Sequence, residues 1–501
     1  MSLLGIDVGT GGCKVAAYSE DGCRLALAYR EYSPSCPKPG WAELPSNAVL
    51  DRIWDAIAEV NAAVAHDPAV ALSVSSLGEA MTPVSAERRP IGNSILCSDA
   101  RGGEYLEFLR TEIGGQNAFY MINPNILAPN YSLPKLMWMR DRMPEMFRDA
   151  WKFMLWGDLV IWMMGAEPMT DFSLANRTLM FDIQKEDWSD RLLGLAGITR
   201  EQLPTVVQSG TVAGEVSGRM ARQLGFKKRV KIVVGGHDQC CNALGAGVFE
   251  AGRAVCGMGT FQCVTPVFDG LPDRDAMLAA GLNIEHHVVP KRFVCFLFNQ
   301  AGALVRWFRD TFAAGDQKLA GTADIYDALL EEMPPEPTRL IVLPAFESGG
   351  SPRLVHGGAG LIGGLRASTT RGEILKAIME GVSMYFVEGL KALKRMGMNI
   401  REMTATGGGA KGDAWLQIQA DVLGIPIARL RETEASAAGA AMLAGMGSGV
   451  FSRPEDAAAL FVREEKVIEP DAARHSFYAE RHRTYEELLR RTEDLFRNLG
   501  G

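Results

Sequence analysis

Lys231-Ile232-Val233-Val234-Gly235-Gly236-His237-Asp238-Gln239 is the stretch around which the chain is organised. An apolar run, two glycines and a following Cys240-to-Gly247 segment predict a buried strand, a tight corner and the start of a helix. Asp238 therefore stands at a strand-to-helix turn. An acid in this place commonly caps the first helical N–H groups. The alternative is a catalytic acid that faces a cleft, and this segment alone does not decide between the two.

The composition is that of an ordinary globular protein. A length of 501 residues is long for one core and predicts two large domains. The net charge of -8 comes without a basic run, so we expect neither nucleic acid nor a membrane as a partner. The nine cysteines form no CxxC pair, which favours reduced thiols and a cytoplasmic protein. We find no export signal, and the apolar window from Phe153 to Met164 is too short to cross a bilayer.

The amino-terminal segment predicts an antiparallel meander over residues 3 to 31. Its first turn, Gly9-Thr10-Gly11-Gly12, leaves backbone N–H groups and a hydroxyl free to face a phosphate. Asp7, just before the turn, could hold Mg²⁺ through a water shell. Alone this is weak evidence, because glycine turns without a ligand are far commoner.

Two further strands of the first half end in polar residues. We expect a strand at 69 to 75 before Gly78-Glu79, and one at 91 to 97 before Asp99 and Arg101. Strand ends of this kind lie where open α/β sheets bind ligands. A helix cap with its salt-bridge partner is the other interpretation of Asp99 and Arg101. Residues 102 to 200 are expected to form a mainly helical insertion on the first domain.

The second half repeats the phosphate-facing hairpin. Gly259-Thr260 lies between two predicted strands, about 250 residues after Thr10, and indicates an internal duplication. Gly407-Gly408-Gly409-Ala410-Lys411 separates a predicted strand from a helix and lets the backbone approach an anionic ligand. It is neither a Walker P-loop nor a dinucleotide fingerprint. The tail, about 465 to 498, is expected to be helical.

Five short motifs occur in the order and rough spacing of one family. The chain resembles the FGGY carbohydrate kinases over essentially its whole length. Each motif is weak alone, but together they make a specific match: Asp7-Val8-Gly9-Thr10, Gly236-His237-Asp238-Gln239, Gly259-Thr260, Gly360-Leu361-Ile362-Gly363-Gly364-Leu365 and Gly407-Gly408-Gly409-Ala410-Lys411.

The resemblance implies an α/β fold of two ribonuclease H-like domains, of the actin, Hsp70 and hexokinase type, with ATP in the cleft between them. We place the sugar-binding domain at 1–244 and the nucleotide-binding domain at 245–501. By the same similarity Asp7 organises Mg²⁺ and Asp238 is the catalytic base. The implied sugar contacts are Glu79, Asn130, Asp238 and Gln239, and the implied ATP contacts are Gly9, Thr10, Gly259, Thr260, Gly302, Gly408, Gly409 and Ala410.

The position of Asp238 between two Gly-Thr hairpins favours catalysis over capping. We expect the helix N-terminus to lower the pKa of Asp238. His237 either touches substrate or only supports the corner, and we leave it out of the catalytic set.

Departures from the family pattern bear on the substrate. The chain lacks the Met-His pair that xylulokinases of the family usually carry, and of the Arg-Glu pair of glycerol kinases it keeps only Glu79. We expect a small sugar or polyol, with a ketopentose such as a xylulose as first candidate and a glycerol or tetritol kinase as an alternative. An actin- or Hsp70-like ATPase is a second class. A weakly active sugar sensor is a third, since Phe261 stands where a small hydroxyl residue often follows Gly-Thr. A homodimer is also left open.

Overall fold

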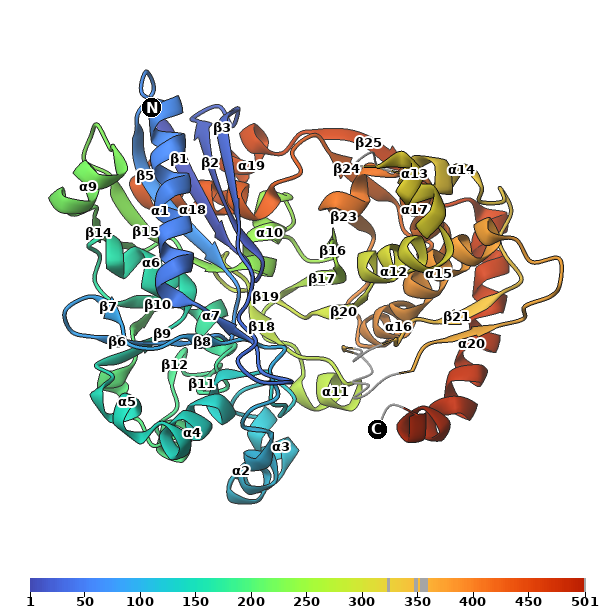
Figure 1. Ribbon diagram of the computed structural model, residues 1–501, viewed down its shortest axis with the longest axis horizontal. Coiled ribbons are helices and arrows are strands. Elements are labelled where there is room, and N and C mark those ends of the chain that lie inside the picture. Colours follow the sequence, from blue (N-terminus) through green and yellow to red (C-terminus); the bar gives the residue numbers. More distant parts are fainter. Residues whose placement is uncertain (322–324, 347–349, 352–358, 500–501) are drawn as a thin grey trace.

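The computed structural model describes residues 1–321, 325–346, 350–351 and 359–499, with side chains as far as residue 492. Two large sheets, each flanked by helices, dominate the molecule, one in each half of the chain (Figure 1). Of the glycine-rich stretch before Leu361, Gly357 and Gly358 lie outside the described residues.

The first sheet has the strand order β14-β15-β5-β1-β2-β3. The predicted meander is confirmed, because β1, β2 and β3 pair antiparallel in sequence order. Strands β5 and β15 continue the sheet parallel to β1, so the carboxyl ends of all three meet at one edge. Their bounds are β1 (Ser2–Val8), β2 (Gly12–Ser19), β3 (Arg24–Glu31), β5 (Ala69–Ser76), β14 (Val212–Glu215) and β15 (Lys231–His237).

The second sheet repeats this plan. Its order is β18-β19-β17-β16-β23-β24-β25, and β20 also pairs with β17. An antiparallel hairpin is again followed by two parallel strands and an antiparallel edge strand. The shared topology supports the internal duplication. The bounds are β16 (Arg253–Met258), β17 (Phe261–Asp269), β18 (Glu285–His286), β19 (Arg292–Val294), β20 (Leu297–Gln300), β23 (Glu402–Thr406), β24 (Ile427–Leu430) and β25 (Glu464–Ile468).

Two helices join the halves. Helix α10 (Asp238–Gly245) packs on α18 (Ala435–Ser448), and α18, although it comes late in the sequence, lies on the first sheet (Figure 1). Glycines make this contact possible. A Cβ at Gly5 of β1 would lie 1.8 Å from the carbonyl oxygen of Ala437, and one at Gly245 would lie 1.9 Å from that of Ala435. The backbones touch directly, so the two halves share one buried seam.

The insertion is mainly helical, as expected, but it also contains short strands. Its elements are α2 (Leu106–Ile113), α3 (Gln116–Tyr120), α4 (Ser132–Arg142), α5 (Pro144–Asp149), β9 (Lys152–Met154), α6 (Trp156–Met164), β10 (Met169–Asp171), α7 (Phe172–Asn176), β11 (Phe181–Asp182), β12 (Asp187–Trp188) and α8 (Asp190–Ala196). The apolar window at 153 to 164 forms β9 and the buried helix α6.

Two local expectations need correction. The strand expected at 91 to 97 is reduced to β8 (Ser94–Ile95). The tail is not helical from residue 465, because residues 464–468 form β25 and helix α20 (Ala472–Leu499) starts later. Pairing with β24 satisfies the backbone of β25 and overrides its charged, helix-like composition. Asp99 and Arg101 form a buried salt bridge of 2.6 Å, which favours a structural role of this pair over a ligand-binding one.

The remaining helices surround the sheets. In the first half they are α1 (Ser46–Ala63) and α9 (Gly218–Leu224); in the second they are α11 (Arg274–Ala279), α12 (Gly302–Phe312), α13 (Ala314–Ala320), α14 (Tyr326–Glu331), α15 (Arg371–Tyr385), α16 (Val387–Arg395), α17 (Asp413–Leu423) and α19 (Pro454–Phe461). A capping box formed by Thr370 and Glu373 opens α15. Of the helices in the described residues, none combines the length and the apolar character needed to span a membrane.

Candidate active site

The strand register brings the predicted acids to one edge of the first sheet. Asp7 on β1 pairs with Ser75 on β5, and Ser75 pairs in turn with Gly236 on β15. Ser75 Oγ donates a 2.9 Å hydrogen bond to Asp7 Oδ1. Asp238 follows two residues after Gly236, as the first residue of α10. The carboxyl ends of three parallel strands thus present two acids to the same space, the usual ligand-binding edge of an α/β sheet.

Burial and neighbouring charges control the acidity of this pair. Burial, followed by the charges of Asp7 and Glu79, raises the pKa of Asp238 to about 7. Burial also raises the pKa of Asp7 to about 6, although the hydrogen bond from Ser75 opposes the change. The expectation that the helix N-terminus would lower the pKa of Asp238 was therefore wrong, since desolvation and like charges outweigh the helix dipole. Asp238 is suited to accept a proton near neutral pH.

His237 lies beside the base. Its Nε2 is 3.3 Å from Asp238 Oδ1, and its backbone N–H donates to Ser173 Oγ at 2.9 Å. Burial, and then the charge of Arg177, holds the pKa of His237 well below its usual range. The ring is neutral at physiological pH, and the backbone contact fixes the corner that carries Asp238.

Glu79 lies in the loop after β5 and is buried, with only 6% of its surface exposed. Arg177, at the end of α7, donates to Glu79 Oε1 from Nε at 2.7 Å and pairs with Glu285 on β18 at 2.9 Å. Asn130 is half-buried in the loop before α4. Gln239 is also half-buried, and a Cβ at Gly257 of β16 would lie 3.8 Å from its Oε1. Gln239 therefore reaches from the first half toward the second sheet.

The first Gly-Thr hairpin forms a tight loop between β1 and β2. Gly9 N–H donates to the Gly12 carbonyl at 3.0 Å, which closes the turn, and Tyr32 donates its hydroxyl to the Gly9 carbonyl at 2.7 Å. Thr10 is exposed. In the described part of the chain, the N–H groups of Thr10 and Gly11 have no acceptor. They are the groups that could face a phosphate.

The second hairpin, Gly259-Thr260, is stapled to the start of α12. Gly302 N–H donates to the Gly259 carbonyl at 3.1 Å, and Ala301 donates to the Thr260 carbonyl at 3.1 Å. A Cβ on Gly302 would lie 2.6 Å from the Gly259 oxygen, so this approach requires glycine. Phe261 points outward and is 46% exposed.

The glycine turn after β23 lies next to the second hairpin. Gly407 adopts φ of 82°, and a Cβ there would lie 2.9 Å from the Met258 carbonyl oxygen. A cavity of about 270 Å³ opens beside this turn, at the carboxyl ends of β23 and β24. Its lining includes Ala410 together with Thr406, Lys411, Arg429 and Glu432. The structure thus gathers Gly259, Gly302 and Gly408 to Ala410 at one edge of the second sheet.

Two residues of this region were missed from sequence. Arg177 donates to Glu79, which lies 98 residues earlier in the chain, and to Glu285, which lies 108 residues later. No local pattern marks either residue, because their pairing exists only after the insertion and β18 have come together. The one local indication in the sequence is Gly78, because a residue without a side chain leaves space beside the polar Glu79 for another group.

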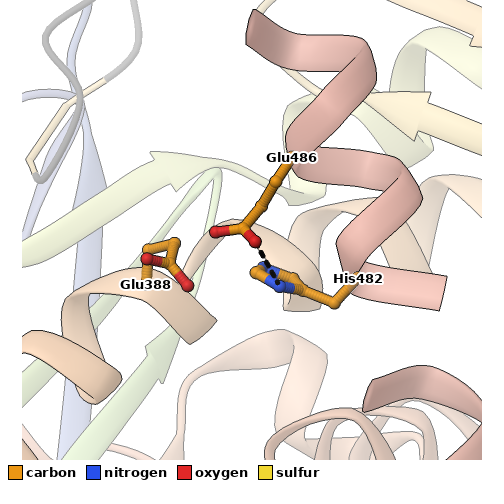
Figure 2. Close-up of side chains that lie close together, drawn as sticks. All are labelled: Glu388, His482 and Glu486. Atoms are coloured by element: carbon orange, nitrogen blue, oxygen red, sulfur yellow. Dashed lines mark ion pairs between the residues drawn. The ribbon is translucent and has the colours of Figure 1, made fainter. Parts of the chain in front are cut away.

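A second cluster of titratable side chains lies where α16 meets α20. Figure 2 shows Glu388, His482 and Glu486, whose candidate ligand atoms all lie within 4.8 Å of one another. Lys391 Nζ is 3.3 Å from His482 Nδ1 and 3.0 Å from Glu388 Oε1. The lysine already supplies the positive charge at this place. We therefore interpret the cluster as an ion-pair network and assign it no metal.

Two sheets of similar topology, with two acids at the edge of the first and a Gly-Thr hairpin in each, are typical of phosphotransferases of the actin and hexokinase type. The model of the N-terminal domain of the FGGY family of carbohydrate kinases matches residues 2–245, and that of the C-terminal domain matches residues 275–448. The chain belongs to the FGGY family of carbohydrate kinases, and it is a carbohydrate kinase.

Known relatives cover nearly the whole chain. Xylulose kinase of Bacillus subtilis is 27% identical over 98% of this chain and 97% of its own length. Glycerol kinase of Citrifermentans bemidjiense is 29% identical over 97% of this chain and 98% of its own. Among solved structures, a xyloylose kinase from Brucella ovis has a TM-score of 0.88 at 26% identity, and covers 99% of this chain and 100% of that one.

Proposed function

We propose that the protein transfers the γ-phosphoryl group of Mg-ATP to a hydroxyl of a small sugar or polyol, with Asp238 as the general base. A ketopentose such as a xylulose is the first candidate, because relatives described as xylulose kinases align along the full chain. Relatives described as glycerol kinases support a small polyol as the alternative. The observation that carries the proposal is the alignment of Asp7, Ser75 and Asp238 at one sheet edge.

Asp238 is the group that would accept the proton of the attacking hydroxyl. A base works best when its pKa is near the working pH, and the pKa of Asp238 is raised to about 7. His237 and Ser173 hold the backbone beside it, so the carboxylate does not have to be ordered when substrate binds. Glu79, Asn130 and Gln239 are the proposed substrate contacts around it.

Catalysis of phosphoryl transfer depends on positioning the reactants and stabilising charge more than on covalent chemistry. The N–H groups of Thr10 and Gly11 would face the phosphate from the first half. Gly259 and Thr260 would hold the phosphate chain from the second, and Gly302 with Gly408, Gly409 and Ala410 would line the adenosine.

Asp7 is the proposed Mg²⁺ residue. The donor set fits, because two half-buried carboxylates with raised pKa values lie at one sheet edge, and a hard cation would offset their charges. When bound, Mg²⁺ would neutralise charge on the phosphate oxygens.

The nine cysteines carry free thiols, in keeping with the predicted cytoplasmic setting.

The test is an ADP-release assay over ketopentoses, aldopentoses, hexuloses, tetritols and glycerol, ranked by kcat/KM. With the best acceptor, Asp238→Ala should lower kcat by about 10³-fold or more, because the hydroxyl loses its proton acceptor. Asp158→Asn, which changes a buried acid on α6, is the matched control and should retain activity. Near-normal activity of Asp238→Ala would refute its role as base. ATP turnover that ignored every acceptor but rose with a protein partner would favour the Hsp70-like alternative.

A further inference from the structure

The loop that carries Glu79 leaves little room for a side chain at the preceding residue. A Cβ on Gly78 would lie 3.0 Å from Cγ and 3.1 Å from Cβ of Arg177, and 3.2 Å from Cδ2 of His237. Arg177 therefore fills the volume beside His237 that a longer residue 78 would occupy. Its side chain is only 11% exposed. The arginine is a built part of the proposed sugar pocket and not a surface residue.

The guanidinium group of Arg177 contacts two carboxylates and two aromatic rings. Nε, at 2.7 Å, and Nη2 both donate to one oxygen of Glu79, Oε1. Nη1 donates to Glu285 Oε1 at 2.9 Å. The rings of Tyr131 and Phe296 lie 4.9 and 5.6 Å from the guanidinium carbon. Both Arg177 donors use Oε1, and in the described residues no group donates a hydrogen bond to Oε2 of Glu79.

The backbone of Glu79 is also held in an unusual conformation. Its φ is 61°, in the left-handed region that residues other than glycine rarely adopt. Ser132, at the start of α4, donates its hydroxyl to the Glu79 carbonyl at 2.6 Å. Such conformations persist where surrounding structure enforces them, and they gather at ligand sites. Ser132 fixes the main chain of Glu79 and Arg177 fixes its carboxylate.

We propose that Arg177 is the positioning residue that presents Oε2 of Glu79 to a substrate hydroxyl, and that this pair restricts the kinase to neutral sugars and polyols. An ionised carboxylate only accepts hydrogen bonds, so its partner must be a donor such as a hydroxyl. A sugar acid would bring a carboxylate toward Glu79, Asp238 and Asp7. Of the nearby cations, Arg177 already pairs with Glu79 and Glu285, and the buried Lys135 donates to the Pro129 carbonyl. This inference rests on the proposed function.

A double-mutant cycle tests the positioning role. Steady-state kinetics with the best neutral acceptor would compare wild type, Arg177→Lys, Glu79→Gln and the double variant. We expect Arg177→Lys to raise the acceptor KM about 10- to 100-fold, with kcat within about threefold and the KM for ATP unchanged, since the lost contact is a binding contact. The double variant should be no worse than Glu79→Gln, because both changes remove one interaction.

Arg101→Lys is the matched control. Arg101 is another buried arginine held by two carboxylates, those of Asp99 and Glu43, and it makes no contact with Glu79. Its change should leave the acceptor KM within about twofold of wild type. Three outcomes would each overturn the positioning role. The first is an unchanged acceptor KM in Arg177→Lys, and the second is additive effects of the two substitutions on the acceptor KM. The third is an equal rise in the acceptor KM in Arg101→Lys.

Paired acceptors test the restriction to neutral substrates. Glycerol would be compared with D-glycerate, and xylitol with D-xylonate, so that each pair differs by one carboxylate. We expect the neutral member to be preferred by at least about 100-fold in kcat/KM. Preference for the acid would overturn this inference while the kinase function stands. Failure of wild type to phosphorylate any sugar, polyol or sugar acid would instead overturn the proposed function, and this inference with it.

Discussion

Lowering the pH from 8 to 6 should reduce kcat/KM for the sugar acceptor by about tenfold. With the pKa of Asp238 at about 7, the ionised base falls from about nine-tenths to about one-tenth of the enzyme over this range. The sign follows from the raised pKa: protonation, which removes the base, occurs near neutral pH. An aspartate with its ordinary pKa of 3.8 would stay ionised and give a flat profile.

The charge of Asp7 gives this prediction a second part. Burial is the first cause of the raised pKa of Asp238, and the Asp7 carboxylate is the next. A divalent cation beside Asp7 would offset that charge, so the acid limb should move to lower pH when Mg-ATP saturates the enzyme. Comparing the profile at sub-saturating and saturating Mg-ATP measures the shift.

The assay is coupled ADP release from pH 5.5 to 9, repeated with doubled coupling enzyme at each pH so that the coupling step is never limiting. A flat profile between pH 6 and 8 at sub-saturating Mg-ATP would refute the electrostatic account of Asp238. A limb that moved to higher pH with Mg-ATP would show that the cation does not lie near Asp7.

Three further predictions concern stability and the metal. Gly5→Ala should destabilise the fold by about 3–5 kcal/mol in urea unfolding, because its Cβ would overlap the Ala437 carbonyl oxygen, whereas Gly194→Ala, at an open helical position, should not. Arg101→Met should cost about 3–5 kcal/mol by the same measurement, since it leaves the Asp99 carboxylate buried without its partner, while the KM values stay near wild type. Removing divalent cations with EDTA should abolish ADP formation, and added Mg²⁺ should restore it; full activity in EDTA would contradict the proposed role of Asp7.

The order of the motifs along the chain predicted the family and the fold, whereas the predicted boundary between the two halves tells less about the structure. The boundary placed at residue 245 remains a prediction, and α18 shows why a cut in the sequence describes this molecule poorly. Although it follows β24 of the second sheet, α18 packs on β1 and α10 through Gly5 and Gly245. The sequence of small residues in α18 does not indicate which strand this helix packs against.

By itself the sequence determined the elements that carry the chemistry. Alternation of apolar residues and glycine turns predicted the β1–β3 meander, and the apolar run ending in Gly235-Gly236 predicted β15 followed by α10 at Asp238. These are local properties, because strand and turn preferences depend on neighbouring residues.

Only the tertiary structure decided how those groups act. The raised pKa of Asp238 depends on burial and on charges 231 and 159 positions away in Asp7 and Glu79. The fixing of Glu79 by Arg177, and of Arg177 by Glu285, depends on the insertion and β18 meeting beside β5. Electrostatic and hydrogen-bonding partners are set by distance in space, and a single sequence does not encode that distance in any local pattern.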